Sequence, residues 1–248
     1  MTLKDAYDTI EIKYKNIMEL EPFQIIKSVD EHRNFWKPTK VKTILLAESH
    51  VHTNETEHAH TIEYDNFSEL KKCPRNFVKL VYCLGYGEKR FTEIKKNSGT
   101  PQFWKIFVAC TYKNFNSEFN KILVSKTPNF DDRIQNKIKI LEKLKENGIW
   151  LLDASIVALY NNNKKPSQKI MKEIIEISWK KYVSEIINET KPGNIIVIGK
   201  GVSKILKDKL TCLNIRFNDQ PQPQARLSKK EIENTYLKYY ELCNGNDL

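Results

Sequence analysis

Three side chains that are able to do chemistry follow directly after short apolar runs in this sequence: Glu48 after 44–46, Asp153 after 149–152, and Lys200 after 195–198. Apolar runs of this length are typical of buried strands. In an α/β sheet, ligands bind at the carboxyl ends of the strands. We therefore expect one sheet edge to carry an acid–base group, a recognition carboxylate and a turn that holds phosphate. Such a set indicates an enzyme that acts on nucleic acid.

The rest of the sequence predicts helices between these strands. Strands are expected at 42–47, 149–152, 194–198 and 213–217, and helices at 3–20, 22–28, 73–84, 102–112, 130–146, 167–189, 201–210 and from 228 onward. Ser228 and Glu231 have the spacing of a capping box at the start of the last helix. Four strands with helical connections predict a parallel sheet covered on both faces. The expected fold class is therefore α/β, a three-layer α/β/α sandwich with a central four-stranded parallel sheet.

Length and composition suit a single globular domain. The chain has 248 residues, of which 40% are hydrophobic and 29% charged. We expect one domain over 1–248, with the motif-bearing part at about 40–230 and N-terminal helices at 1–38 packed on it. No apolar run approaches the roughly 20 residues that a membrane span needs, and the polar segment 1–8 is no signal peptide. A cytoplasmic protein without a membrane partner is expected.

The net charge indicates the kind of binding partner, and the cysteine content indicates which metal sites and disulfides to expect. The formal net charge is +10, from 41 basic and 31 acidic residues, and such a surplus favours a polyanion such as DNA. A proteome rich in lysine would produce the same surplus. The five cysteines are odd in number and form no C-x-x-C pair, which argues against a disulfide framework, a zinc ribbon and an iron–sulfur cluster. We expect them to be reduced packing residues.

In chain order, the strand ends resemble the motifs of the uracil-DNA glycosylase superfamily. Residues 47–52 (Ala-Glu-Ser-His-Val-His) lie where that family positions the hydrolytic water, and Glu48 matches the acid of a branch with Gly-Glu-Ala-Pro-Gly. Residues 148–155 resemble the family's Gly-Val-Leu-Leu-Leu-Asn strand, with Asp153 in place of the Asn. Residues 195–206 resemble the strand, glycine and helix that touch DNA phosphates.

Two further segments extend the resemblance over about 40–230. Residues 100–106 (Thr-Pro-Gln-Phe-Trp-Lys-Ile) resemble the Asn-Arg-Phe-Trp-Lys segment of the mismatch-specific branch, and residues 220–227 resemble the His-Pro-Ser-Pro loop that precedes the wedge residue. Each motif departs from the family pattern: Ser49 replaces an Asp or Asn, His50 a Pro, and Gln220 the His. The order, spacing and strand context of the motifs carry the resemblance. An unrelated α/β enzyme is the alternative.

The resemblance and the residue types together assign roles to individual side chains. The catalytic set is Glu48, Ser49, His50 and Gln220; the base-recognition set is Asp153, Phe103, Trp104 and His52; the DNA-binding set is Lys200, Gly201, Ser203, Gln222, Arg226 and Leu227. A carboxylate near the sugar orients water and stabilises an oxocarbenium-like transition state, while hydrogen-bond donors stabilise the departing base. No cofactor and no metal is expected, and the protein is expected to be a monomer.

Asp153 suggests the class of base. An Asn at this position donates to O4 of uracil, whereas an ionised Asp accepts only, which suits the N4 amino group of cytosine. A protonated Asp153 would instead donate to cytosine N3 while accepting from N4. The structural alternative is an N-cap of a possible helix at 154–160. Because removal of plain cytosine would harm the host, we expect a modified cytosine, with defence against phage DNA as a hypothesis.

Other assignments have structural alternatives of their own. Phe103 and Trp104 suit base stacking but also suit a helix core, and Leu227 suits a wedge in the DNA or an apolar contact at the start of a helix. His50, His52, His58 and His60 form two H-x-H pairs that suit zinc. Alternatively, His50 or His52 supplies the donor to the leaving base that is missing because Gln220 replaces the family's His, and Gln220 or Gln222 donates more weakly, without a charge.

The sequence as a whole predicts a monofunctional DNA glycosylase that flips out a base and leaves an abasic site. A uracil or mismatch repair glycosylase, a catalytically inactive DNA-binding module of the same fold, and a metal-dependent hydrolase built on the histidines are the alternatives.

Overall fold

A computed structural model describes residues 2–64, 66–94, 97–161, 165–222 and 228–245. Its sheet consists of β1 (Thr43–Ala47), β2 (Ile149–Asp153), β3 (Asn194–Ile198) and β4 (Arg216–Gln220), in the order β2-β1-β3-β4. Every pair of neighbouring strands is parallel. The predicted α/β class and four-stranded parallel sheet are therefore confirmed.

The strands differ in how deeply they are buried. All residues of β1 and β2 are buried, and so is β3 after Asn194. The edge strand β4 is partly exposed. It begins three residues later than predicted, because the preceding helix runs to Thr211 and Asn214 makes a turn with a φ of +57° before the chain extends.

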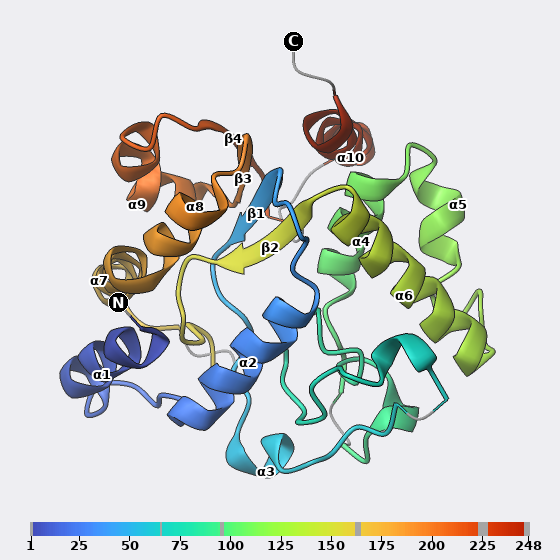
Figure 1. Cartoon of the computed structure of the whole chain (residues 1–248), viewed down its shortest axis with the longest axis horizontal. Coiled ribbons are helices and arrows are strands. Elements are labelled where there is room, and N and C mark those ends of the chain that lie inside the picture. The colour runs from blue at the N-terminus through green and yellow to red at the C-terminus, as the bar shows by residue number, and fades with distance from the viewer. Residues whose placement is uncertain (1, 65, 95–96, 162–164, 223–227, 246–248) are drawn as a thin grey trace.

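The helices form two layers around this sheet. α1 (Leu3–Tyr14), α7 (Gln168–Ser178), α8 (Ser184–Thr190) and α9 (Lys200–Thr211) lie on one side, and α4 (Pro101–Thr111), α5 (Phe115–Asn120) and α6 (Phe130–Glu146) on the other (Figure 1). The remaining helices are α2 (Phe23–Phe35), the short α3 (Glu55–His58) and α10 (Lys229–Asn244), which packs on α4. The arrangement is that of a three-layer α/β/α sandwich.

Most helix predictions are confirmed, including 130–146 at its bounds and the Ser228–Glu231 capping box. The helix expected at 167–189 contains a π-helical segment, Trp179–Val183, between α7 and α8. The first helix ends at Tyr14 rather than at 20, and α2 extends to Phe35 rather than to 28.

Two predicted helices are wrong. Residues 73–84 form turns, and the segment 154–160 after β2 is not helical. In 73–84 nearly every apolar side chain is buried, so the segment runs through the core as a coil. The high apolar content of this segment therefore comes from its burial on all sides, and not from the single apolar face of an amphipathic helix. Two short 3₁₀ turns, Ser68–Leu70 and Lys89–Phe91, lie near it in the chain.

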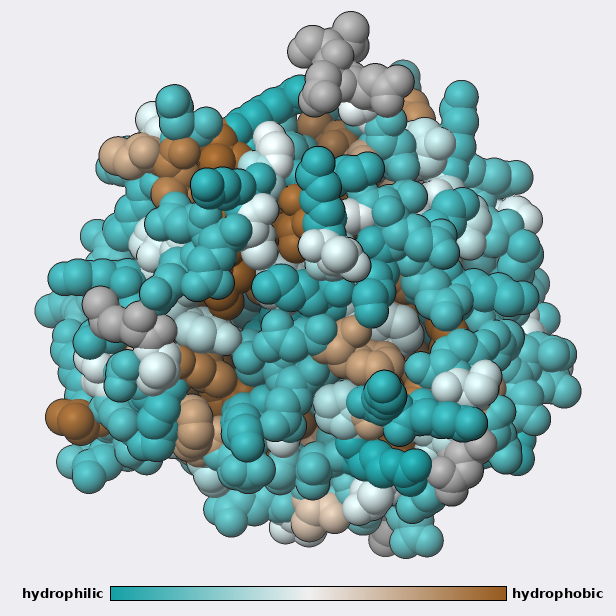
Figure 2. Space-filling view, in the orientation of Figure 1, coloured by the Kyte–Doolittle hydropathy of each residue, from teal (hydrophilic) through white to brown (hydrophobic). Residues whose placement is uncertain are grey.

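One continuous apolar core joins the N-terminal helices to the sheet. Ala6 and Ile10 of α1 belong to the same cluster of buried side chains as β1 and Tyr239 of α10. Tyr14 donates a hydrogen bond to Glu173 of α7 at 2.6 Å, which fastens α1 to the helical layer. The outer face in Figure 2 is mostly hydrophilic, with scattered apolar atoms. None of the helices in the described parts of the chain is long and apolar enough to cross a membrane.

A prediction concerns Gly148, which ends α6 and starts β2 with a φ of +76°. A Cβ there would lie 2.7 Å from the Lys40 carbonyl oxygen, so alanine would be strained by both its backbone and its contact. Gly148→Ala is expected to lower the free energy of unfolding by about 1–3 kcal/mol in urea denaturation. Gly193→Ala, which precedes β3 and would place its Cβ 3.7 Å from the Lys42 carbonyl, is the matched control. Equal stability of the two variants would contradict the prediction.

Candidate active site at the carboxyl edge of the sheet

The ends of all four strands lie along one edge. In the parallel register Ala47 pairs with Asp153, Leu46 with Val197, and Ile198 with Gln220. The chain passes from β1 to β2 on one side and then returns to β3 on the other side of β1. Such a switch point is where α/β sheets open a crevice for ligands. The predicted alignment of the strand ends along one edge of the sheet is thus confirmed.

Glu48 lies at this switch point. Its side chain is 11% exposed, and its Oε2 accepts a hydrogen bond from the Tyr160 hydroxyl at 2.6 Å. Lys165 donates to the same Tyr160 oxygen at 2.7 Å, with its Nζ 3.9 Å from Oε1 of Glu48. Burial and the Glu48 carboxylate raise the pKa of Tyr160. The phenol therefore stays protonated and donates a hydrogen bond to Glu48.

Glu48 also faces the start of α9. A Cβ placed on Gly201 would lie 3.9 Å from Oε1 of Glu48, so the carboxylate lies against the first turn of that helix. Gly199 caps the helix with a φ of +102°, and a Cβ there would lie 2.7 Å from Cγ of Gln222. The positive φ favours glycine at this position. The exposed Lys200 follows at the positive end of the helix dipole, where phosphate binds well.

Asp153 belongs to a buried ionic chain of five side chains. Its Oδ2 accepts from Arg33 at 2.8 Å, and Arg33 also lies 3.3 Å from Asp30. Nδ1 of His50 is 3.6 Å from the same Asp153 oxygen, too far for a hydrogen bond but close enough for charge attraction. Nε2 of His50 lies 2.8 Å from Glu21. His50 therefore lies between two carboxylates.

In this ionic chain, burial and the neighbouring charges shift each pKa in opposite directions, and the neighbouring charges have the larger effect. Burial alone raises the pKa of Glu21, but His50 outweighs it and the pKa is lowered. Burial likewise raises the pKa of Asp153, which His50 and Arg33 lower below its usual value. For His50 burial lowers the pKa, yet Glu21 and Asp153 raise it to about 9. The imidazolium form of His50 thus holds two ionised carboxylates.

These contacts revise two predictions. Because 154–160 is not helical, the N-cap alternative for Asp153 is wrong, and its structural partners are Arg33 and His50. The ionised Asp153 is an acceptor, so the protonated alternative for this carboxyl is disfavoured. The side chain of His50 is fully enclosed and contacts carboxylates, which makes it a positioning residue and not a group that touches the reacting water.

Glu21 and Arg33 had no signal in the sequence. Glu21 lies in the link before α2 and Arg33 lies within α2, and neither follows a strand. Burial reveals them, because both side chains are almost inaccessible at 1% and 7% exposed. Only the folded chain places them beside the strand ends.

The remaining predicted edge residues support the backbone. Ser49 accepts a hydrogen bond from the Leu159 amide at 3.2 Å, and Ser203 donates to Asp219 at 2.6 Å. The Gln220 carbonyl accepts from the Gly199 amide at 2.8 Å. Arg226 and Leu227 lie outside the described residues.

The predicted stacking residues lie on another element. Trp104 of α4 is buried against Phe107, with the ammonium of Lys137 5.1 Å from its ring. Its neighbour Phe103 is partly buried against the core. Both side chains thus pack in or against the core, as the structural alternative for them expects. No contact in the described residues brings either one to Glu48.

The histidines do not form a joint site. His58 pairs with the Ser28 hydroxyl at 2.9 Å, while Nε2 of His52 is buried without a hydrogen-bond partner among the described residues. Within the described parts of the chain, no three His, Cys, Asp or Glu side chains lie close enough together to hold a metal ion.

No protein-family model matches this sequence, and no curated protein matches it. The resemblance to the uracil-DNA glycosylase superfamily therefore stays a prediction that its residues alone carry.

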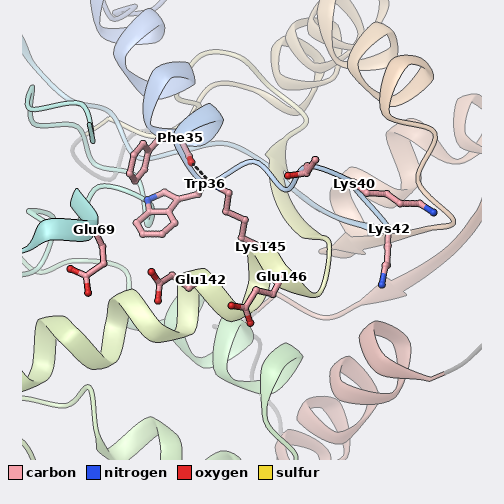
Figure 3. Close-up of a pocket in the computed structure, with 9 residues that line it drawn as sticks. Phe35, Trp36, Lys40, Lys42, Glu69, Glu142, Lys145 and Glu146 are labelled. Atoms are coloured by element: carbon pink, nitrogen blue, oxygen red, sulfur yellow. Dashed lines mark hydrogen bonds between the residues drawn. The ribbon is translucent and has the colours of Figure 1, made fainter. Parts of the chain in front are cut away.

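An open cavity lies away from this edge. A cavity of about 570 Å³ is lined by Lys40 and Lys42 before β1 and by Glu146 before β2, so it lies at the amino ends of these strands (Figure 3). Its charges are mixed, and Lys145 donates to the Phe35 carbonyl at 3.2 Å. The carboxyl edge, where α/β sheets bind ligands, remains the candidate active site.

The charged state of His50 predicts a pH dependence of stability. A pKa raised from 6.5 to about 9 by folding gives stabilisation that is complete below about pH 6.5 and is lost as the pH rises through 9. Urea unfolding at about pH 6 and pH 10 should show a loss on the order of 3 kcal/mol beyond that of His50→Gln, which cannot titrate. Parallel pH profiles for the two proteins would contradict a charged His50.

Proposed function

We propose that the protein is a monofunctional DNA glycosylase that hydrolyses the N-glycosidic bond of a flipped base, with preference for a modified cytosine. The observation that carries the proposal is the placement of Glu48. Its carboxylate lies at the switch point of the sheet, beside the first turn of α9, and the ionised Asp153 ends the neighbouring strand β2. A general base, a phosphate-binding turn and an acceptor for an amino group share this edge.

The chemistry needs a negative group near the sugar. As the glycosidic bond breaks, the sugar acquires oxocarbenium character, and a fixed carboxylate lowers the energy of this cation. Tyr160 and Lys165 hold Glu48 in place, so the carboxylate needs little reorganisation. It accepts a proton as water attacks the anomeric carbon.

DNA contact and release of the base involve neighbouring groups. The amino end of α9 with Lys200 suits a backbone phosphate, and the net charge of +10 favours DNA as the partner. The departing base gains negative charge and needs a donor. Gln220 suits this role, and so does Nε2 of His52, which has no hydrogen-bond partner among the described residues.

Base preference follows from the charge of Asp153. An ionised carboxylate accepts hydrogen bonds only and therefore suits the exocyclic amino group of cytosine better than O4 of uracil. A host must spare its own cytosine, so a modified cytosine, as in phage DNA, is the proposed substrate. Defence against phage is the biological setting that fits this selectivity.

A second candidate is a glycosylase for uracil or mismatched bases. The contacts of Asp153 with Arg33 and His50 favour it, because a carboxylate held by two cations can serve structure alone. In that case the base is read by other groups at the edge. The substrate distinguishes the two candidates.

The first prediction for function concerns Glu48. Glu48→Gln keeps the length of the side chain and an oxygen for Tyr160, but it removes the negative charge and the base. Release of free base is expected to fall by about 10²–10⁴-fold, with DNA binding retained. Mass spectrometry of bases released from uracil-containing, unmodified and modified-cytosine DNAs measures this.

Glu19→Gln is the matched control, since Glu19 accepts from Asn161 near the same loop but follows no strand. Its activity should equal that of the wild-type protein. If the wild-type protein binds DNA but releases no base from any of these DNAs, the glycosylase proposal is wrong and a DNA-binding module replaces it.

A second prediction separates the two candidate substrates. Asp153→Asn adds an amide donor, which should shift the preference toward uracil by about tenfold or more, since a good hydrogen-bond pair to a base is worth about 1–3 kcal/mol. Asp30→Asn, which removes the other carboxylate beside Arg33, controls for the weakened ionic chain. Unchanged selectivity in a folded Asp153→Asn protein would assign Asp153 to structure and favour the second candidate.

A further inference from the structure

A second cavity, of about 140 Å³, lies between α4, α6 and the loop at 86–88. Trp104, Phe119, Ile122 and Leu123 supply its apolar wall, and Glu88 and Lys137 supply its charged side. It shares no lining residue with the edge that carries Glu48 and Asp153. Its size suits a compact organic molecule built on a single small ring.

The charges around this cavity do not balance. Arg133 binds both oxygens of Glu88, with its closest nitrogen at 2.6 Å, and Lys137 donates to the same carboxylate at 2.6 Å. Lys137 is 5% exposed, and Glu88 is the carboxylate among the described residues with which it forms an ion pair. Two buried cations thus share one buried carboxylate, which leaves one positive charge unmatched.

Lys137 also has donors to spare. An ammonium group can donate three hydrogen bonds, and within the described residues Lys137 donates one, to Glu88. The face of Trp104, whose ring centre is 5.1 Å away, provides a weaker contact. Leaving a buried cation short of partners is costly, so an anionic partner in the cavity would stabilise it.

The start of α4 provides an independent sign of a ligand. Thr100 is the N-cap residue, lines the cavity and is 5% exposed, yet its hydroxyl makes no capping hydrogen bond. Its Oγ1 is buried without a partner among the described residues. The helix dipole adds positive potential at this end. The Thr100 hydroxyl, which has no partner among the described residues, and the amino end of α4 therefore line the same cavity as the unmatched charge of Lys137.

We propose that this cavity is a binding site for a small organic carboxylate, a monoanion on a compact apolar body. One negative charge matches the one unmatched positive charge, whereas a phosphate dianion would exceed it. The carboxylate accepts from Lys137 and Thr100, and the apolar body packs on Trp104 and Ile122. The site is separate from the candidate active site and does not depend on the proposed glycosylase reaction.

The test uses benzoate as the probe and neutral benzamide as its isostere, with isothermal titration calorimetry of the full-length protein. Benzoate should bind saturably and benzamide at least about tenfold more weakly, because a charge-assisted hydrogen bond is lost. Lys137→Met should weaken benzoate binding by about tenfold or more, and Thr100→Val by about fivefold. Lys139→Met removes the same charge from an exposed position of α6 and should leave binding unchanged.

Circular dichroism establishes that each variant is folded, and Thr100→Val, which is close to isosteric, keeps the test decisive if Lys137→Met does not fold. The proposal is overturned by the absence of saturable benzoate binding, by equal binding of benzamide, or by an unchanged affinity in the folded variants.

Discussion

The buried ionic chain that runs from Glu21 through His50 and Asp153 to Arg33 and Asp30 is the constraint on which the candidate site depends. A buried charge without a partner costs several kcal/mol, so these groups must meet if the chain is to fold at all. They come from the link between α1 and α2, from α2 itself, from the loop after β1 and from the end of β2. The ionic chain therefore fixes the N-terminal helices against the carboxyl edge of the sheet.

The same contacts set the backbone around Glu48. The carboxylate of Glu21 accepts from the Thr53 amide at 2.7 Å and from the Ala158 amide at 3.2 Å. These bonds hold the loop after β1 and the loop after β2 side by side. The second loop continues to Tyr160, whose hydroxyl binds Glu48. Glu21 thus helps to set the positions of both loops, although no hydrogen bond among the described residues joins its side chain to Glu48 or to Asp153.

Much of this edge could be predicted from the sequence, because buried parallel strands are nearly continuous apolar runs and the residue after each run must lie at the carboxyl edge. This rule predicts the places of Glu48, Asp153 and Lys200 at the strand ends. Periodicity failed at 73–84, where burial on all sides gives the same apolar density as a helix. Periodicity also gives no sign of Glu21 and Arg33, because tertiary packing, and not local spacing, brings their partners to them. Trp104 shows a second limit of prediction from sequence, because an aromatic pair in a helix has the same pattern whether it contacts a ligand or packs in the core.

The two buried clusters differ in the sign of their excess charge. The cluster at the sheet edge has three carboxylates and two cations, if His50 is counted as charged, whereas the cluster around Glu88 has one carboxylate and two cations. A negative excess beside the strand ends repels the phosphates of DNA, which Lys165, Lys200 and the overall positive charge must offset. In the proposed reaction the same excess is useful, since it acts on the positive charge that develops on the sugar more strongly than on the neutral ground state. Interactions that strengthen only in the transition state accelerate a reaction. The ionic chain would then supply part of the electrostatic stabilisation as well as the geometry of the site.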